Sequence, residues 1–348
     1  MSTTLEPNAT AAHPGAPEIR LLYRRGDGEL QLNCSSDRIA DAIADGGGIA
    51  WIDIEDRESN TAAVEPLLRD LFRFHPLAIE DALKEAHVPR VDDWQAYLYI
   101  IFHTIDFDPD TDEIRLHEVD VFLGPNYLLT YHTEPIAVLD SHRQIIERDP
   151  QRRLRHGADG LLYHLLDHAV AEYLPALEHL DEAIDAAQDE VFDHPTKETL
   201  KAIFRIKRSA NRFNRILVPQ RELLNRLARD PYDQISTDCR VYFRDVYDHM
   251  VRIHEITEGL RDLISGALDT YLSAISNRTN DIMKTLTLVT VMFMPLTFVV
   301  GFFGMNFFGG SLEFGAPLPK ATLFTISCLA MALMPGIIWL WGRLRKWY

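Results

Sequence analysis

Two long uncharged apolar runs near the C-terminus constrain this chain more than any other feature. The first runs from Thr285 to Phe303 and the second from Ala321 to Trp341. At about 1.5 Å per residue in a helix, the first run spans roughly 28 Å, which is close to the thickness of a bilayer core. A short segment, Asn306 to Lys320, joins them. The pattern predicts a transmembrane hairpin with both ends on one side of the membrane.

Polar and flexible residues interrupt the first run at helical spacing. Thr290, Met294, Thr297 and Gly301 lie three or four positions apart. The run is followed by Gly304-Met305-Asn306, and a carboxamide has no use in a lipid-facing anchor. A plain anchor for a soluble domain is the simplest alternative, and these residues argue against it.

Charge is distributed unevenly along the 348 residues. The net charge is −17, but from Ile282 onward one acid faces five basic residues, so the first 281 residues carry −21. A strongly acidic soluble region argues against nucleic acid as a partner and suits cations. The basic residues flank the runs: Lys284 before the first, and Arg343, Arg345 and Lys346 after the second. By the positive-inside rule we expect both termini in the cytoplasm of a protein of the inner or plasma membrane.

Cysteine usage and the N-terminus indicate a reducing compartment. Cys34, Cys239 and Cys328 are far apart and form no Cys-x-x-Cys pair, so neither a disulfide framework nor a zinc site is expected. Residues 1–17 are polar and lack the apolar core of a signal peptide. We expect this segment to be a disordered tail.

The first domain reads as a mixture of strands and helices. Ile19 to Leu32 alternates apolar and polar residues around a Gly-Asp-Gly turn and predicts a hairpin. Ile49 to Ile54 predicts a buried strand, and Asn60 to Phe74 a helix. Further strands are predicted at Tyr97–Asp106, Leu116–Leu123 and Tyr127–Thr133. Residues 18–157 are therefore assigned to an α+β domain, resembling an α/β/α sandwich.

The next part, residues 158–232, has helical periodicity throughout. Ala158 to Phe192 predicts one helix whose last part is acidic, and Thr196 to Arg229 a second helix rich in Lys and Arg. The simplest interpretation is an antiparallel helical pair with complementary charges. An acidic lobe that senses cations is the alternative.

A third helix is predicted from near Arg240, with no Gly-Pro break before Pro295. Continued into the membrane it would have about 60 residues and a length of roughly 95 Å. A helix this long needs partners, and a bundle of copies is the simplest solution, so we expect a homo-oligomer. The expected segments are a stalk helix at 233–284, a pore-lining first transmembrane helix at 285–303, a loop at 304–320, a second transmembrane helix at 321–341 and a basic tail at 342–348.

Several segments together resemble the CorA family of magnesium channels over nearly the whole chain. Gly-Met-Asn alone is a weak signal, but after a long helix and Met-Pro-Leu-Thr, with one more span and a basic tail, it is highly specific. The segments that carry the resemblance are His75-Pro76-Leu77 with Glu80-Asp81, Tyr242–His249, Tyr271-Leu272-Ser273, Met294–Thr297 and Gly304–Asn306.

The resemblance implies a funnel-shaped homopentamer in membrane lipid and a passive channel for Mg²⁺ influx, with Co²⁺ and Ni²⁺ as additional ions, rather than an enzyme. No ATP-binding motif is present, since Gly46-Gly47-Gly48 lacks a following Lys-Ser/Thr. One alternative is a zinc transporter of the same superfamily. Those usually carry Gly-Ile-Asn, so Met305 counts against it. The other is a membrane-anchored sensor that binds cations without transport.

The resemblance places a selectivity filter at Gly304 and Asn306. Mg²⁺ gives up its water reluctantly, so a wide ring of neutral oxygens suits it better than a tight carboxylate cage. A helix C-cap is the structural alternative for Asn306. The predicted pore face below the filter is Gly301, Thr297, Met294, Thr290, Leu286, Met283, Asn280 and Asp269, with the apolar members as a gate and Asp269 at the inner mouth. Ordinary core packing and a solvated stalk position are the alternatives for Met283, Leu286, Met294 and for Asp269.

The resemblance also maps Asp81 and Asp245 onto a regulatory Mg²⁺ contact between neighbouring subunits, with Glu80 and Asp167 close by. The alternative is that these acids pair with local arginines such as Arg244. Two features depart from the family pattern. Phe303 stands where the family usually has Tyr, and the outer loop has Glu313 as its only acid, in a shifted position.

Overall fold

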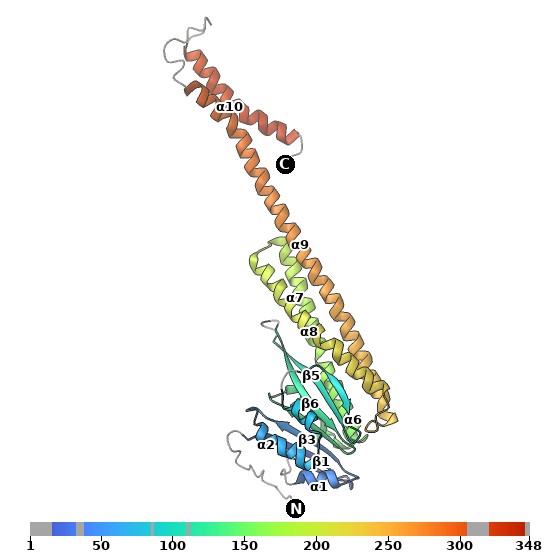
Figure 1. Ribbon diagram of the computed structural model, residues 1–348. Helices are drawn as coiled ribbons and strands as arrows, with labels where there is room; N and C mark the ends of the chain where they lie inside the picture. The colour runs from blue at the N-terminus through green and yellow to red at the C-terminus, as the bar shows by residue number, and fades with distance from the viewer. Residues whose placement is uncertain are drawn as a thin grey trace, which may run out of the picture. The chain divides into compact units, whose positions relative to one another are not determined.

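The computed structural model describes residues 16–32, 38–84, 87–108, 111, 113–304 and 320–344. The chain divides into two compact units, residues 1–269 and 270–348. The first unit holds a sheet with its covering helices, followed by a group of long helices (Figure 1). The second unit holds the C-terminal part of the longest helix and the last helix.

One mixed sheet of seven strands forms the centre of the first domain, in the order β2-β1-β3-β7-β6-β5-β4. Only β3 and β7 pair in parallel; the other neighbours are antiparallel. The predicted hairpin at Ile19–Leu32 is confirmed, and Gly28 supplies the positive φ of 94° in its turn. The strands are β1 (Glu18–Arg24), β2 (Leu30–Leu32), β3 (Ile49–Glu55), β4 (Arg90–Asp93), β5 (Leu98–Asp108), β6 (Glu113–Leu123) and β7 (Tyr127–His132).

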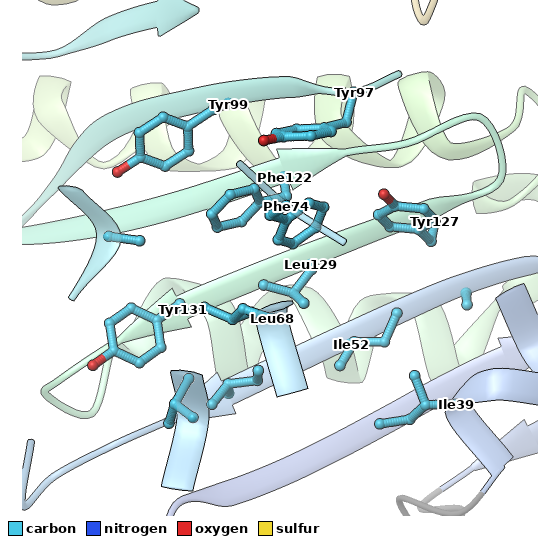
Figure 2. Packing of buried hydrophobic residues seen from close by; sticks show 14 of the residues in the cluster. Ile39, Ile52, Leu68, Phe74, Tyr97, Tyr99, Phe122, Tyr127, Leu129 and Tyr131 are labelled. Atoms are coloured by element: carbon cyan, nitrogen blue, oxygen red, sulfur yellow. The ribbon is translucent and has the colours of Figure 1, made fainter. Parts of the chain in front are cut away.

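Short helices cover one face of the sheet and enclose the main apolar core. Phe74 stacks on Phe122 with ring centroids 4.1 Å apart, and Tyr97 and Tyr127 surround the pair (Figure 2). Because side chains alternate along a strand, Ile52 and Ile54 point into this core while Asp53 points to the other face. The helices near this face are α1 (Ile39–Ala44), α2 (Thr61–Pro66), the π-helix η2 (Leu67–Leu71) and α3 (Pro76–Ala82). The helix predicted over Asn60–Phe74 is observed over Thr61–Leu71, as α2 followed directly by η2.

Asp53 is fully buried on the opposite face of the sheet, and basic neighbours compensate the negative charge of its carboxylate. Arg20 and His132 approach its two carboxylate oxygens at 2.8 and 3.2 Å. Burial alone would raise the pKa of Asp53, but its hydrogen bond and charge contact with His132, and the charge of Arg20, outweigh burial and lower the pKa to about 2. On this face lie α4 (Ala137–Arg148) and α6 (Ala158–Ala171), with the short α5 (Pro150–Arg153) between them in the chain.

The helix predicted over Ala158–Phe192 is broken at Glu172 into α6 and α7 (Tyr173–Asp193). Pro175 explains the break, because a proline has no N–H to donate and its ring clashes with the carbonyl four residues earlier, at Ala171. The partner helix α8 (Lys197–Arg229) begins at a capping box formed by Thr196 and Thr199 and packs along α7. The two helices pack against each other as predicted, while the complementary charges of the pair stay a prediction.

The longest helix, α9 (Thr237–Gly304), has 68 residues and starts slightly before the predicted position near Arg240. Its start is fixed by Asp159 of α6, whose Oδ2 accepts hydrogen bonds from the Ser236 backbone N–H at 2.9 Å and hydroxyl at 2.7 Å. The last helix is α10 (Lys320–Leu344). Within the described ranges, one helix is long and apolar enough to cross a membrane, the part of α9 up to Gly301, while the described apolar stretch of α10 is Met331–Trp341.

Candidate cation pathway and regulatory carboxylates

The apolar members of the predicted pore face are exposed within the single chain. Met283, Leu286 and Met294 are 56%, 59% and 67% exposed. Core packing inside this chain therefore does not account for them, and leaving such large side chains in water would cost free energy in proportion to their apolar area. Lipid or further copies of the helix would have to cover them. The remaining members, Asn280, Thr290, Thr297 and Gly301, lie on the same helix α9, as does Asp269.

The two pore-face threonines use their hydroxyl protons within the helix. Thr290 Oγ1 donates to the Leu286 carbonyl at 2.9 Å, and Thr297 Oγ1 donates to the Phe293 carbonyl at 3.0 Å. The hydroxyl oxygens are then left as hydrogen-bond acceptors. A hydrated cation presents O–H groups outward, so acceptors on the wall of a pore match its water shell.

The predicted filter lies at the end of the described part of α9. Gly304 is the last residue of this helix. Asn306, Met305 and Glu313 are outside the described residues, so the filter geometry and the C-cap alternative for Asn306 remain predictions.

Glu80 and Asp81 lie on helix α3, and each is paired with a basic residue. Glu80 is bound by Lys84 one turn later in sequence. Asp81 Oδ2 accepts a hydrogen bond from Arg90 Nη2 at 2.6 Å. The helix is held at its start by His75, whose ring Nδ1 accepts from the Leu77 N–H at 3.2 Å, with Pro76 in the first turn. Both carboxylates therefore lie in the last turn of α3, at the surface of the domain, where Lys84 and Arg90 hold them.

Asp167 on α6 and Asp245 on α9 form a second acidic pair. Burial raises the pKa of Asp167, the imidazole of His249 lowers it, and the charge of Asp245 raises it again. His249 Nδ1 lies 3.8 Å from Asp167 Oδ1. Burial raises the pKa of Tyr163, and the charges of Asp167 and Asp245 raise it further. The rings of Tyr163 and Tyr242 lie 5.1 Å apart. Two acids close enough to perturb each other would be relieved by a bound cation.

The four carboxylates thus form two separate groups within one chain. Among the residues that the structure describes, no group of three or more His, Cys, Asp or Glu side chains is arranged to hold a metal ion. The contact between neighbouring subunits that the resemblance implies therefore stays a prediction. The alternative that these acids pair with local arginines is confirmed for Asp81, although its partner is Arg90 and not Arg244.

Sequence reasoning missed the basic partners Lys84, Arg90 and His249. The spacing of Glu80 and Lys84, four residues apart on one helix, could have revealed the first. Arg90 lies on strand β4, beyond a loop, and only the fold brings it to Asp81.

A cavity of about 600 Å³ lies elsewhere in the domain, between the β5–β6 pair and α8. Its carboxylate Glu118 is engaged by two imidazoles, His87 Nδ1 at 3.1 Å and His103 Nε2 at 3.6 Å. His117 is paired with Glu134 at 2.7 Å. The buried Nδ1 of His103, the other ring nitrogen, has no hydrogen-bond partner among the described residues.

A family model and the curated relatives of this chain all point to metal ion transporters. The family described as "CorA-like Mg2+ transporter protein" matches residues 46–343. The cobalt/magnesium transport protein CorA of Thermotoga maritima is 34% identical over 278 residues, covering 80% of this chain and 78% of that protein. The putative metal ion transporter YfjQ of Bacillus subtilis is 31% identical over 300 residues, covering 86% and 89%.

Solved structures show the same fold. The complete CorA magnesium transporter from Methanocaldococcus jannaschii superposes with a TM-score of 0.77 at 22% identity, covering 94% of this chain and 98% of that one. Full-length CmaX gives a TM-score of 0.71 at 22% identity, covering 94% and 97%. The predicted fold class, a soluble α/β domain followed by a long helix, is confirmed. With the family match spanning most of its length, this chain belongs to the CorA-like family of divalent cation transporters.

Proposed function

We propose that the chain forms a passive channel for Mg²⁺ influx, driven by the membrane potential and closed by cytosolic Mg²⁺. The observation that carries this proposal is the face of α9, where exposed apolar side chains alternate with threonine acceptors. A divalent cation entering at −100 mV gains about 4.6 kcal/mol, at about 2.3 kcal/mol per charge, which is enough to drive accumulation. Co²⁺ is proposed as an additional substrate because relatives are named cobalt/magnesium transport proteins, and Ni²⁺ as a further one.

The proposed arrangement follows the predicted segments. Residues 18–157 and 158–232 form the cytoplasmic part, 233–284 the stalk, 285–303 the pore helix and 321–341 an outer helix in contact with lipid, with both termini in the cytoplasm. Gly304 and Asn306 form the filter, Thr297 and Asn280 contact the water shell, and Asp269 attracts cations at the inner mouth. Five copies surround the pore, a number that rests on the family resemblance.

Uptake by liposomes that contain the purified protein and a Mg²⁺-sensitive dye tests transport directly. We expect potential-driven uptake by the wild type and at least a tenfold loss in Asn306→Ala, because the filter loses its oxygen ring. Asn211→Ala, at an exposed position on α8 outside the predicted pore, is the matched control and should transport normally. Uptake that persists unchanged in Asn306→Ala would exclude the proposed filter.

The same liposomes separate the alternatives. Zn²⁺ uptake driven by a proton gradient, without Mg²⁺ uptake, would favour a zinc transporter. A structural neighbour, the cytoplasmic domain of ZntB from Vibrio parahaemolyticus, shares the fold at 11% identity and a TM-score of 0.58, so fold alone does not decide the ion. No uptake of any divalent cation by folded protein would favour a membrane-anchored sensor.

The proposed regulatory site joins Glu80 and Asp81 of one subunit to Asp167 and Asp245 of its neighbour. Bound Mg²⁺ would neutralise carboxylates that otherwise repel, and would hold the closed state by binding it more tightly than the open one. Asp81→Asn combined with Asp245→Asn should leave transport active at high internal Mg²⁺. Unchanged inhibition in the double variant would rule out this site.

A further inference from the structure

Arg90 bridges two carboxylates at the end of the domain that carries α3. Its Nη2 lies 2.6 Å from Asp81 Oδ2, and its Nε lies 2.9 Å from Asp92 Oδ2. Asp92 follows two positions after Arg90 on β4, so both side chains point to the same face of this strand. β4 is at the edge of the sheet. The guanidinium therefore ties α3 to the edge strand through Asp81.

The bridge is open to solvent and to ions. The side chains of Asp81, Arg90 and Asp92 are 38%, 34% and 41% exposed. A cation approaching Asp81 would meet a carboxylate oxygen that already accepts a charge-assisted hydrogen bond. A guanidinium and a divalent cation on one carboxylate repel each other, so binding of the cation weakens or displaces the contact with Arg90.

Arg90 keeps a second carboxylate partner, Asp92, when it leaves Asp81. Since its Nε is already bonded to Asp92, leaving Asp81 costs it one contact and not both. Two of the other three proposed regulatory acids also have a basic neighbour: Glu80 pairs with Lys84, and Asp167 lies beside His249. In each case a basic side chain of the same chain occupies a carboxylate that the cation would use.

We infer that Arg90 is an internal competitor of the regulatory cation at Asp81, and that this competition sets the cytosolic Mg²⁺ concentration at which the channel closes. The inference rests on the proposed role of Asp81. Removing the positive charge of Arg90 makes Asp81 available and strengthens Mg²⁺ binding. The expected gain in Mg²⁺ affinity is about two- to fivefold per site, which corresponds to the free energy of a partly exposed ion pair.

Mg²⁺ binding by the full-length protein in detergent gives a readout that does not depend on transport. The rate of limited proteolysis is measured against Mg²⁺ concentration, and the midpoint of protection is compared between variants. We expect Arg90→Gln to lower the midpoint about two- to fivefold, and Arg90→Lys, which keeps the charge, to remain near the wild type. Arg115→Gln is the matched control: Arg115 lies 4.0 Å from Asp106 in a similar exposed pair on β5 and β6 and should not shift the midpoint.

Asp81→Asn separates failure of the inference from failure of the proposed regulatory site. If the midpoint is unchanged in Asp81→Asn, Asp81 does not bind the cation and both proposals fail. If Asp81→Asn raises the midpoint but Arg90→Gln leaves it unchanged or raises it, only the competition is excluded. In the Asp81→Asn background, Arg90→Gln should have no further effect. The melting temperature of Arg90→Gln without Mg²⁺ shows whether this variant is folded. If it is unfolded, Arg90→Lys still tests whether the positive charge is what matters.

Discussion

At the scale of single residues, Asp120 is a buried acid whose pKa is shifted upward. It is 4% exposed on β6, and its Oδ1 accepts a hydrogen bond from the Tyr99 hydroxyl at 2.5 Å. Burial raises its pKa well above the ordinary value, the Tyr99 hydrogen bond lowers it, and the charge of Glu118 raises it. The folded protein therefore holds a proton that the unfolded chain releases near pH 4.

This proton makes stability depend on pH in a direction that can be measured. Since the folded-state pKa of Asp120 is raised, its contribution to stability falls as pH increases from about 4 through the raised pKa. Asp120→Asn cannot ionise, so its melting temperature should exceed that of the wild type by a few degrees at pH 8 and match it at pH 4. Thermal unfolding at both pH values measures this, with Asp92→Asn as an exposed control. A lower melting temperature for Asp120→Asn at pH 8 would contradict the assignment.

How much of the site the sequence predicts depends on where the partners lie in the chain. The Glu80–Lys84 pair is local and follows from helical spacing. The bridge from Arg90 to Asp81 depends on how β4 returns beside α3, which no local pattern contains. The same holds for Asp53. Its strand was predicted as buried, but its partners Arg20 and His132 come from β1 and β7, one on each side of β3. The filter and the subunit contacts remain predictions.

At the scale of elements, hydrophobic periodicity predicts helices better than it predicts their ends. The segment from Ala158 to Phe192 has one continuous pattern, yet Pro175 breaks it into α6 and α7. The start of α9 is also set by a distant residue, since Asp159 holds Ser236 immediately before the first turn. The strands that were predicted lie at nearly their observed positions, because turn residues bound them on both sides. The short edge strand β4 was not predicted.

On the predicted pore face of α9, the Thr297 hydroxyl is expected to contact the water shell of Mg²⁺. Thr297→Val keeps the shape of the side chain but removes the oxygen that accepts from the water shell. The loss of one such hydrogen bond per subunit should lower Mg²⁺ uptake by liposomes about two- to tenfold. Thr297→Ser restores the acceptor and should recover most of the uptake.

Thr285→Val is the matched control for this effect. Thr285 also donates to a carbonyl one turn earlier, that of Asp281 at 2.9 Å, but it lies about 120° around the helix from Thr297. If both valine variants reduce uptake equally, the effect belongs to the helix and not to the pore face.

At the scale of the whole molecule, the fold class could be predicted while the assembly could not be derived. An α+β domain and a long helix follow from the order of strand and helix patterns along the chain. The structure places the boundary between its two units within α9, after Asp269, a position that no change in composition marks. Assembly depends on surfaces that a single chain leaves uncovered, and here these include the apolar side chains of α9 and α10.

Disulfide trapping of Asp81→Cys together with Asp245→Cys tests the assembly and the regulatory contact at once. In a background with Cys34→Ser and Cys328→Ser, only the buried Cys239 remains. If the two positions meet across neighbouring subunits of a pentamer, oxidation yields a ladder of covalent species of up to five chains. Each single variant gives no ladder, because one thiol per chain cannot link a ring. Mg²⁺ competition is absent in these variants, so the ladder reports proximity alone. A crosslink confined to single chains would show that both positions meet within one subunit, and the regulatory site would then need no neighbour.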